Sequence, residues 1–322
     1  MLDTVTSERF PVLNRAYSDV FQPGNLTVGL VVPIERYHTS AVPSMDRHLE
    51  RAQLAEELGF SALWLRDVPF NVPSFGDAGQ MFDPFVYLGM LSAATTDIAL
   101  GTASIILPLR HPAHVAKAAA SADVLSGGRL LFGVASGDRP EEYPALNMSF
   151  EDRGTRFRDS VAYMNAVWTD YPNHDGSHGR LSGGIDMLPK PTGPRVPMLI
   201  TGGSQQEPGW IAGNGDGWMT YPRDIPAQAR VISDYRGRVA ATGSTNKPVM
   251  QSLYVDLVAD PDTAATPIHL GFRSGVSYLQ TYLNGLRDAG MNHVAINLRF
   301  NQGDVEDTLK RLADEILPAF HS

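Results

Sequence analysis

The chain contains no cysteine among its 322 residues. Disulfide bonds, thiolate metal sites and cysteine nucleophiles are therefore excluded. The sequence also lacks the H-E-x-x-H spacing of zinc proteases and the G-x-S-x-G elbow of α/β-hydrolases. We therefore expect no resident metal ion and no hydrolytic triad.

No run of lysine or arginine occurs, and the formal net charge is −9. This balance argues against a nucleic-acid surface, because such surfaces gain much of their affinity by neutralising phosphates. No apolar run approaches the roughly 20 residues that span a bilayer, and residues 1–25 lack the apolar core of a signal peptide. We expect a soluble, cytoplasmic protein that binds neither nucleic acid nor membrane.

What the sequence does contain is a regular alternation of short apolar runs with longer segments of helical periodicity. Its hydrophobic content of 43% is sufficient for a large core. The strand-forming runs are 26–34, 61–67, 98–107, 129–137, 197–203, 216–222, 250–260 and 293–300. The helical segments that follow them are 45–58, 83–95, 111–125, 151–169, 205–213, 226–240, 274–289 and 304–320.

Strict alternation predicts parallel strands joined by helical crossovers. Eight such units favour a closed (β/α)8 barrel, or TIM barrel, whose typical size is about 250 residues. A doubly wound open sheet is the alternative, but the first strand-to-helix turn lacks the glycine-rich fingerprint of that fold. We predict an N-terminal extension at 1–25, one barrel domain at 26–322, and insertions at about 170–196 and 260–274.

In a parallel barrel the active site lies where the strands end and the following loops begin. Polar residues gather at six of these junctions, whereas the opposite junctions carry mainly glycine and ordinary helix ends. This asymmetry predicts an enzyme. The junction residues are Arg66, Asp67, Arg110, His111, Ser136, Gly137, Asp138, Arg139, Thr201, Gly202, Gly203, Ser204, Tyr221, Arg223, Asn297, Arg299 and Asn301.

Several junction residues also have ordinary structural interpretations. Arg66 and Asp67 can pair with each other, Asp138 suits a turn, and His111 can begin the helix that follows it. The junction ITGGSQQ (200–206) is more specific, because small residues let backbone amides approach a ligand at the start of a helix. Such a turn suits a phosphate, although a plain helix cap would explain it equally well.

Three segments resemble bacterial luciferase and the luciferase-like flavin monooxygenases. They are AEELGFSALWLRD (55–67), the long run from GTASIILPLRHP to LLFGVASG (101–137), and PMLITGGSQQEPGWIAGNGDGWM (197–219). The likeness extends over nearly the whole chain from about residue 26. The runs RDVPFNVPSFGDAGQMFDP and SGDRPEEYP resemble one subfamily in particular.

The resemblance implies a flavin in the barrel mouth, with its ring against a non-prolyl cis peptide at the end of the third strand. The matching positions are Ala103 and Ser104. The family's phosphate site matches Gly203 and Ser204, and a second flavin-contacting segment follows the fourth strand. The candidate cofactor-binding residues are Ala103, Ser104, Ser136, Gly137, Asp138, Arg139, Gly202, Gly203, Ser204, Gln205, Tyr221 and Arg223.

The chain also departs from luciferase. Luciferase has an arginine at the position matching Ser136, a glutamate at the position matching Gly203, and a catalytic histidine in the region of Asp67 and Val68. The phosphate contacts must therefore come from other groups, and light emission is not predicted. The arginines available for this purpose are Arg110, Arg139 and Arg223.

The activity that the resemblance implies is a flavin-dependent monooxygenase acting on a small organic substrate with O2. A separate flavin reductase would supply reduced FMN, since no nicotinamide fingerprint is present, and a homodimer is expected. Asp67 and His111 are the candidates for moving protons. Arg66 and Arg110 are the candidates for stabilising an anionic flavin or peroxide, with loop 68–84 as a lid.

Two other functions remain open at this point. Dehydrogenases and reductases of the same superfamily use an 8-hydroxy-5-deazaflavin coenzyme, transfer hydride and do not use oxygen. A non-catalytic flavin-binding protein is the other alternative, because the luciferase groups are missing.

Overall fold

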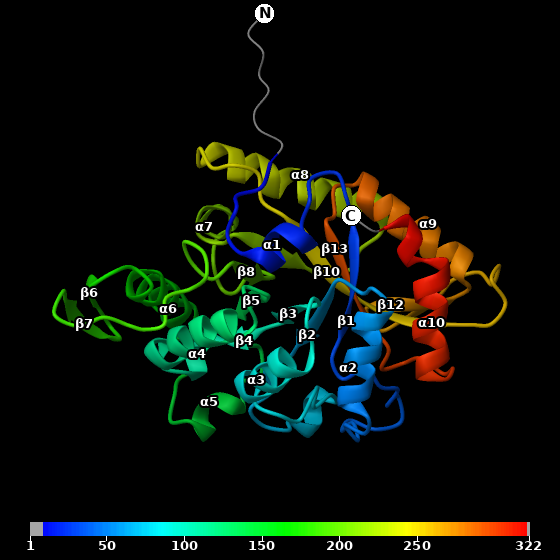
Figure 1. Ribbon diagram of the computed structural model, residues 1–322, viewed down its shortest axis with the longest axis horizontal. Helices are drawn as coiled ribbons and strands as arrows, with labels where there is room; N and C mark the ends of the chain where they lie inside the picture. The colour runs from blue at the N-terminus through cyan, green and yellow to red at the C-terminus, as the bar shows by residue number, and fades with distance from the viewer. Residues whose placement is uncertain (1–8, 321–322) are drawn as a thin grey trace, which may run out of the picture.

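Eight parallel strands close into a barrel in the computed structural model, which describes residues 9–320 (Figure 1). The ring closes because β9 pairs with β10, β10 with β13, and β13 with β1. The (β/α)8 prediction is therefore confirmed. The barrel strands are β1 (Thr27–Val31), β2 (Ala62–Leu65), β3 (Ala99–Thr102), β5 (Leu130–Ala135), β8 (Met198–Thr201), β9 (Gly217–Thr220), β10 (Val249–Leu257) and β13 (His293–Asn297).

Helices follow the strands and surround the barrel. Aspartates cap three of them at the N-terminus, where Asp83, Asp224 and Asp304 accept hydrogen bonds from first-turn amides. Within residues 9–320 no helix is both long and apolar enough to cross a bilayer. The surrounding helices are α2 (His48–Glu57), α3 (Pro84–Ala94), α4 (Pro112–Leu125), α6 (Arg153–Val167), α7 (Pro208–Asn214), α8 (Ile225–Ala241), α9 (Val276–Asp288) and α10 (Val305–Glu315).

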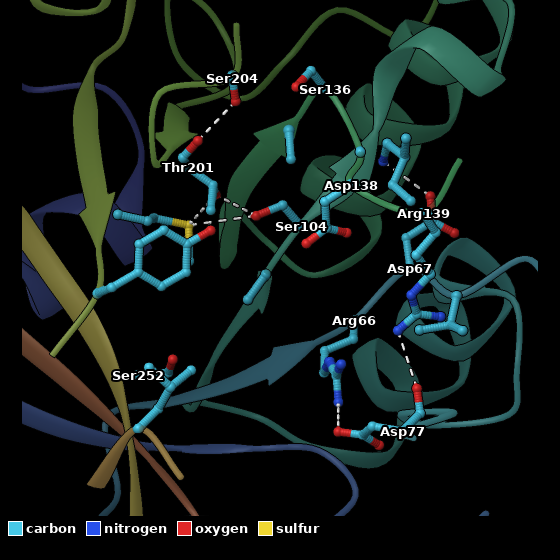
Figure 2. A pocket seen from close by; sticks show the side chains of 18 of the residues that line it. Arg66, Asp67, Asp77, Ser104, Ser136, Asp138, Arg139, Thr201, Ser204 and Ser252 are labelled. Carbon is cyan, nitrogen blue, oxygen red and sulfur yellow. Dashed lines mark hydrogen bonds and ion pairs between the residues drawn. The ribbon is translucent and has the colours of Figure 1, made fainter. Parts of the chain in front are cut away.

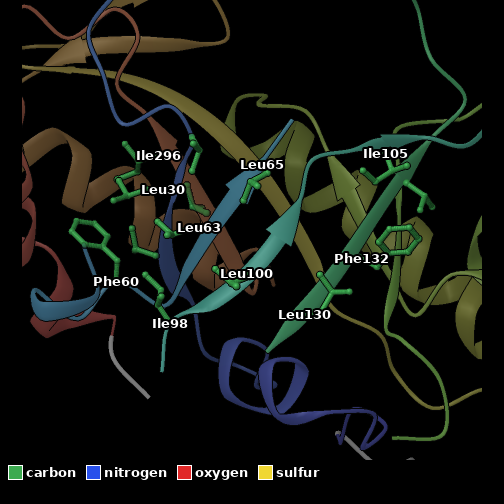
Figure 3. Close-up of a cluster of buried hydrophobic side chains, with 14 of the residues drawn as sticks. Leu30, Phe60, Leu63, Leu65, Ile98, Leu100, Ile105, Leu130, Phe132 and Ile296 are labelled. Atoms are coloured by element: carbon green, nitrogen blue, oxygen red, sulfur yellow. The ribbon is translucent and has the colours of Figure 1, made fainter. Parts of the chain in front are cut away.

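The main core lies between the strands and these helices (Figure 3). Barrel strands are buried on both faces, which explains why their sequences are continuous apolar runs rather than alternating ones. Leu30, Leu63, Leu100 and Phe132 are fully or almost fully buried in this layer. Each such side chain contributes about 1.5–3 kcal/mol relative to an exposed position.

A second cluster fills the barrel interior towards the N-terminal ends of the strands. Helix α1 (Arg15–Val20) packs against this end, and the Tyr17 hydroxyl donates to the Asp216 carbonyl at 2.6 Å. Inside, Trp64 Nε1 donates to His293 Nε2 at 2.8 Å. Burial lowers the pKa of His293 to about 3, so the ring is a neutral acceptor. Residues 9–25 therefore help to fill this end, and free space remains towards the opposite one.

The predicted third strand, 98–107, is interrupted. Strand β3 ends at Thr102, the Ala103–Ser104 peptide bond is cis, and the chain resumes as β4 (Ile105–Ile106). β3 pairs with both β2 and β5, whereas β4 pairs with β5. The apolar run predicts one continuous strand because its residue pattern contains no signal for a change in backbone direction.

The two predicted insertions contain small hairpins. Region 170–196 holds β6 (Asn173–Gly176) antiparallel to β7 (Gly179–Ser182). Region 260–274 holds β11 (Thr266–Ile268) antiparallel to β12 (Gly271–Ser274), and β12 continues the sheet beside β10. A short helix that the sequence did not predict, α5 (Glu142–Ala145), follows β5.

Candidate active site

A cavity of about 780 Å³ lies at the carboxyl ends of the barrel strands. Twelve of the sixteen candidate residues line it, and four do not. Those that line it are Arg66, Asp67, Ala103, Ser104, Ser136, Gly137, Asp138, Arg139, Gly203, Ser204, Gln205 and Tyr221. Those outside the lining are Arg110, His111, Gly202 and Arg223.

Small hydroxyl side chains and a thioether form part of the cavity floor (Figure 2). The Ser104 hydroxyl is hydrogen-bonded to the Thr201 hydroxyl, and Thr201 Oγ1 donates to Met219 Sδ at 3.2 Å. The Ala103–Ser104 cis peptide lies at this point, as the family resemblance implied. A floor without large polar side chains leaves room for a flat ring.

The turn after β8 presents backbone to one end of the cavity. Gly202, Ser204 and Gln205 have positive φ angles of 55°, 42° and 58°. The amides of Gly203 and Ser204 donate no hydrogen bond to another described residue. A Cβ at Gly203 would meet nothing within 4 Å, so the turn is open towards the cavity. Such a concave turn of free N–H groups suits an anion.

Ser204 does not cap the following helix. Its hydroxyl donates to the Thr201 carbonyl at 2.7 Å, while α7 begins at Pro208 with Glu207 at the N-cap position. An ordinary helix cap at Ser204 therefore does not explain this turn.

Arg153 is a cavity residue that sequence reasoning missed. It lies in the first turn of α6, and Gly154 brings that turn so close to Gln205 that a Cβ there would approach the Gln205 Cβ to 2.8 Å. The guanidinium is 3.6 Å from the Phe150 ring centroid, and its Nε atom has no partner among the described residues. The strand-end rule overlooked Arg153 because it follows a loop and a short helix.

Asp77 forms an ion-pair cluster on the other side of the cavity (Figure 2). Arg66 Nη1 is 2.6 Å and Arg299 Nη1 is 3.0 Å from Asp77 Oδ2, and the Tyr37 hydroxyl donates to Oδ1 at 3.1 Å. Burial alone would raise the pKa of Asp77, but Arg66, the Gly79 amide and Arg299 outweigh it and lower that pKa. The carboxylate therefore stays ionised.

Asp67 lines the cavity but is fully engaged in hydrogen bonds. Its carboxylate accepts from the Ile106 amide at 3.1 Å, and from Arg110 Nη2 at 2.8 Å and Nε at 3.2 Å. Arg110 also contacts Asp83 at 3.0 Å. The pair therefore links the turn after β4 to the end of β2, and Arg110 itself does not line the cavity.

His111 is an exposed N-cap residue. Its Nδ1 accepts from the Ala113 amide at 3.2 Å at the start of α4, and its ring lies near His178 and Tyr163. Neither His111 nor Arg110 is among the described residues that line the cavity. The proline after His111 starts α4 at once and fixes His111 as its cap.

Gly202 and Arg223 serve local structure. The Gly202 amide donates to the Met219 carbonyl at 2.8 Å, and Arg223 donates to Thr220 Oγ1 and to the Tyr221 carbonyl at 2.8 Å each. Tyr221 itself lines the cavity and is half-exposed.

These features fit a flavin-type cofactor. The Gly203 turn leaves space for a phosphate, Arg153 lines the cavity from the helix start beside Gln205, and the side chains at Ala103 and Ser104 are small. A pocket of about 300–1,000 Å³ is typical of ligand sites, and this one lies within that range.

Comparison with known proteins identifies the family. The luciferase-like monooxygenase family model matches residues 26–321. An uncharacterised Mycobacterium tuberculosis protein, Rv0953c, is 33% identical over 239 residues, which are 68% of this chain and 82% of the relative. An F420-dependent hydroxymycolic acid dehydrogenase of the same organism is 26% identical over 249 residues, 76% of this chain and 66% of the relative.

A solved structure shows the same fold. It is the oxygenating constituent of 3,6-diketocamphane monooxygenase from Pseudomonas putida in complex with FMN. It superposes with a TM-score of 0.73 at 15% identity, covering 91% of this chain and 98% of that chain. The chain belongs to the luciferase-like monooxygenase family, which includes both FMN-dependent monooxygenases and F420-dependent dehydrogenases.

Proposed function

We propose that the protein is an FMN-dependent monooxygenase that takes reduced FMN from a separate reductase. The observation that carries the proposal is the cavity that joins the small side chains at Ala103 and Ser104 to the open Gly203 turn. The bound cofactor would supply the redox chemistry: reduced FMN, O2 and substrate give oxidised FMN, water and the substrate with one added oxygen atom.

At the phosphate end, the amides of Gly203 and Ser204 would donate to phosphate oxygens, and Arg153 would add a charge-assisted contact. Charge-assisted hydrogen bonds contribute about 1.5–3 kcal/mol each. The side chains of Ser136 and Gln205 line the same end and offer further donors. This set replaces the luciferase arginine and glutamate that the chain lacks.

At the ring end, Ser104 and its neighbours would form the floor, and loop 68–84 would cover the opening. Phe75 of this loop lines the cavity, with the Arg139 guanidinium 4.2 Å from its ring centroid. The loop would keep water from the reacting atoms. Asp67 would act as a positioning residue through Ile106 and not as a proton carrier, because its oxygens are already hydrogen-bonded.

A second candidate is hydride transfer with the deazaflavin coenzyme F420. The F420-dependent hydroxymycolic acid dehydrogenase, which aligns with 76% of this chain, favours it. The same phosphate turn and the same floor would hold either cofactor, since both carry a tricyclic ring and a phosphate.

The test is a parallel titration of the purified protein with FMN and with F420, each oxidised and reduced. Binding of reduced FMN, followed by substrate-dependent oxygen uptake with a flavin reductase, supports the proposal. F420 binding without oxygen uptake supports hydride transfer. Binding without turnover on a broad substrate panel supports a non-catalytic flavin-binding protein, and no binding of either cofactor refutes all three.

The homodimer stays a prediction of the family resemblance. It would use α3 and α4, on which Val86 and Leu125 are 72% and 71% exposed. Sedimentation velocity measures it directly: a monomer at micromolar concentration contradicts the prediction.

A further inference from the structure

Three arginines face the cavity on the side away from the Ser204 turn. Arg66, Arg139 and Arg299 all line it, and their side chains are 18%, 4% and 11% exposed. We call them the arginine cluster. Figure 2 shows Arg66 and Asp77 at one end of the view and Ser204 at the other. The cluster is therefore separate from the proposed phosphate end.

The arginine cluster has fewer acidic partners than guanidinium groups. Asp77 pairs with Arg66 and Arg299, whereas Arg139 reaches only the Asp77 carbonyl, at 3.0 Å. Glu142 lies 3.7 Å from Arg139 Nη1 but accepts no hydrogen bond from it. The Asp77 carboxylate thus serves two guanidinium groups at hydrogen-bonding distance, and Arg139 has a carboxylate only at 3.7 Å.

Buried donors of the cluster lack acceptors. Arg139 Nη1 and Arg299 Nε have no hydrogen-bond partner among the described residues. Leaving such donors unpaired in a buried site is unfavourable. A hydrogen bond from one of them to a ligand acceptor therefore contributes more binding free energy than the same bond at an exposed site. Asp138, another acidic residue of the cavity lining, is exposed and forms no hydrogen bond with either arginine.

The cluster is also held in place before any ligand arrives. Arg299 Nη2 donates to the Ser40 carbonyl at 3.2 Å and to the Gly76 carbonyl at 2.6 Å. The Arg139 guanidinium stacks on Phe75, and Arg66 is bound to Asp77. Fixed side chains lose little rotamer entropy on binding, which favours recognition of a planar anion by guanidinium groups.

We infer that the substrate carries a carboxylate, which Arg139 and Arg299 bind on the side of the cavity opposite the cofactor phosphate. The inference rests on the proposed function, because it assigns the remaining part of the cavity to substrate. A cofactor phosphate is the other source of the same anionic chemistry, and the experiment separates the two.

The experiment measures calorimetric affinities for matched carboxylates and amides, benzoate against benzamide and hexanoate against hexanamide, with and without FMN. We expect at least one carboxylate to bind at least tenfold more tightly than its amide. Arg299→Gln and Arg139→Gln should each reduce that preference at least fivefold, and Arg139→Lys should restore part of it. Arg238→Gln is the matched control, because Arg238 pairs with Asp234 on the exposed face of α8.

The outcomes separate this inference from the proposed function. The inference is overturned if no carboxylate of the panel binds more tightly than its amide. It is also overturned if Arg139→Gln and Arg299→Gln both keep the wild-type preference for carboxylate over amide. The same variants are titrated with FMN and riboflavin: a selective loss of FMN affinity assigns the cluster to the cofactor phosphate and also overturns it. A carboxylate preference without cofactor binding supports the anion site and refutes the proposed function alone.

Discussion

Gly203→Leu tests the proposed phosphate turn without disturbing the fold. Gly203 is exposed, has no positive φ angle, and a Cβ placed there meets nothing within 4 Å. A leucine side chain can therefore be accommodated, but it would occupy the space that the cofactor phosphate needs. We expect the melting temperature to stay near that of the wild type while cofactor affinity falls.

The size of the loss follows from the contacts. If the leucine displaces the phosphate from the Gly203 and Ser204 amides, two charge-assisted hydrogen bonds of about 1.5–3 kcal/mol each are lost. Their sum, about 3–6 kcal/mol, corresponds to a weakening of roughly 10²–10⁴-fold. Flavin fluorescence titration of FMN and F420 measures this change directly.

The matched control is Gly209→Leu. Gly209 lies six residues further along, in α7, and its Cβ would also meet nothing within 4 Å, but it does not line the cavity. The control should bind cofactor like the wild type. Unchanged affinity in Gly203→Leu, or equal losses in both variants, would refute the assignment of the turn to phosphate.

Three further predictions concern other parts of the molecule. Burial raises the pKa of Glu142 to about 7, against the opposing effect of its arginine neighbour, so its ionisation should lower stability as the pH rises from 5 to 8. The free energy of unfolding of Glu142→Gln should therefore increase by about 1–3 kcal/mol relative to that of the wild type over that interval. Urea denaturation at each pH measures this difference, and parallel pH profiles of the two proteins would contradict the prediction. Gly101→Ala places a methyl group against the Trp64 indole and should cost about 1–3 kcal/mol or more, measured by chemical denaturation. Asp67→Asn weakens the link to Arg110 and should lower kcat more than cofactor affinity; an unchanged kcat would contradict the positioning role.

The barrel is predictable from the sequence because its signals are local. Each strand is a short apolar run and each helix a longer periodic one. In a closed barrel of parallel strands, consecutive strands are neighbours, so the strand order follows from the sequence order. The position of the cis peptide at Ala103–Ser104 came from family resemblance, because nothing in the apolar run itself marks a change in backbone direction.

The site is only partly predictable. Strand-end positions identify Ser136, Gly203 and Arg66 correctly as cavity residues, because strand direction fixes where those ends lie. The same rule fails for His111, whose side chain turns outward to cap α4. It also misses Arg153, which reaches the cavity from a helix start that the fold brings beside the turn after β8.

A crystal structure of the protein with bound FMN tests the central claim most directly. We predict density for the tricyclic ring against Ala103 and Ser104, with the phosphate within hydrogen-bonding distance of the Ser204 amide and of Arg153. Density for the phosphate at Arg139 and Arg299, or for the ring outside the barrel mouth, would contradict the account.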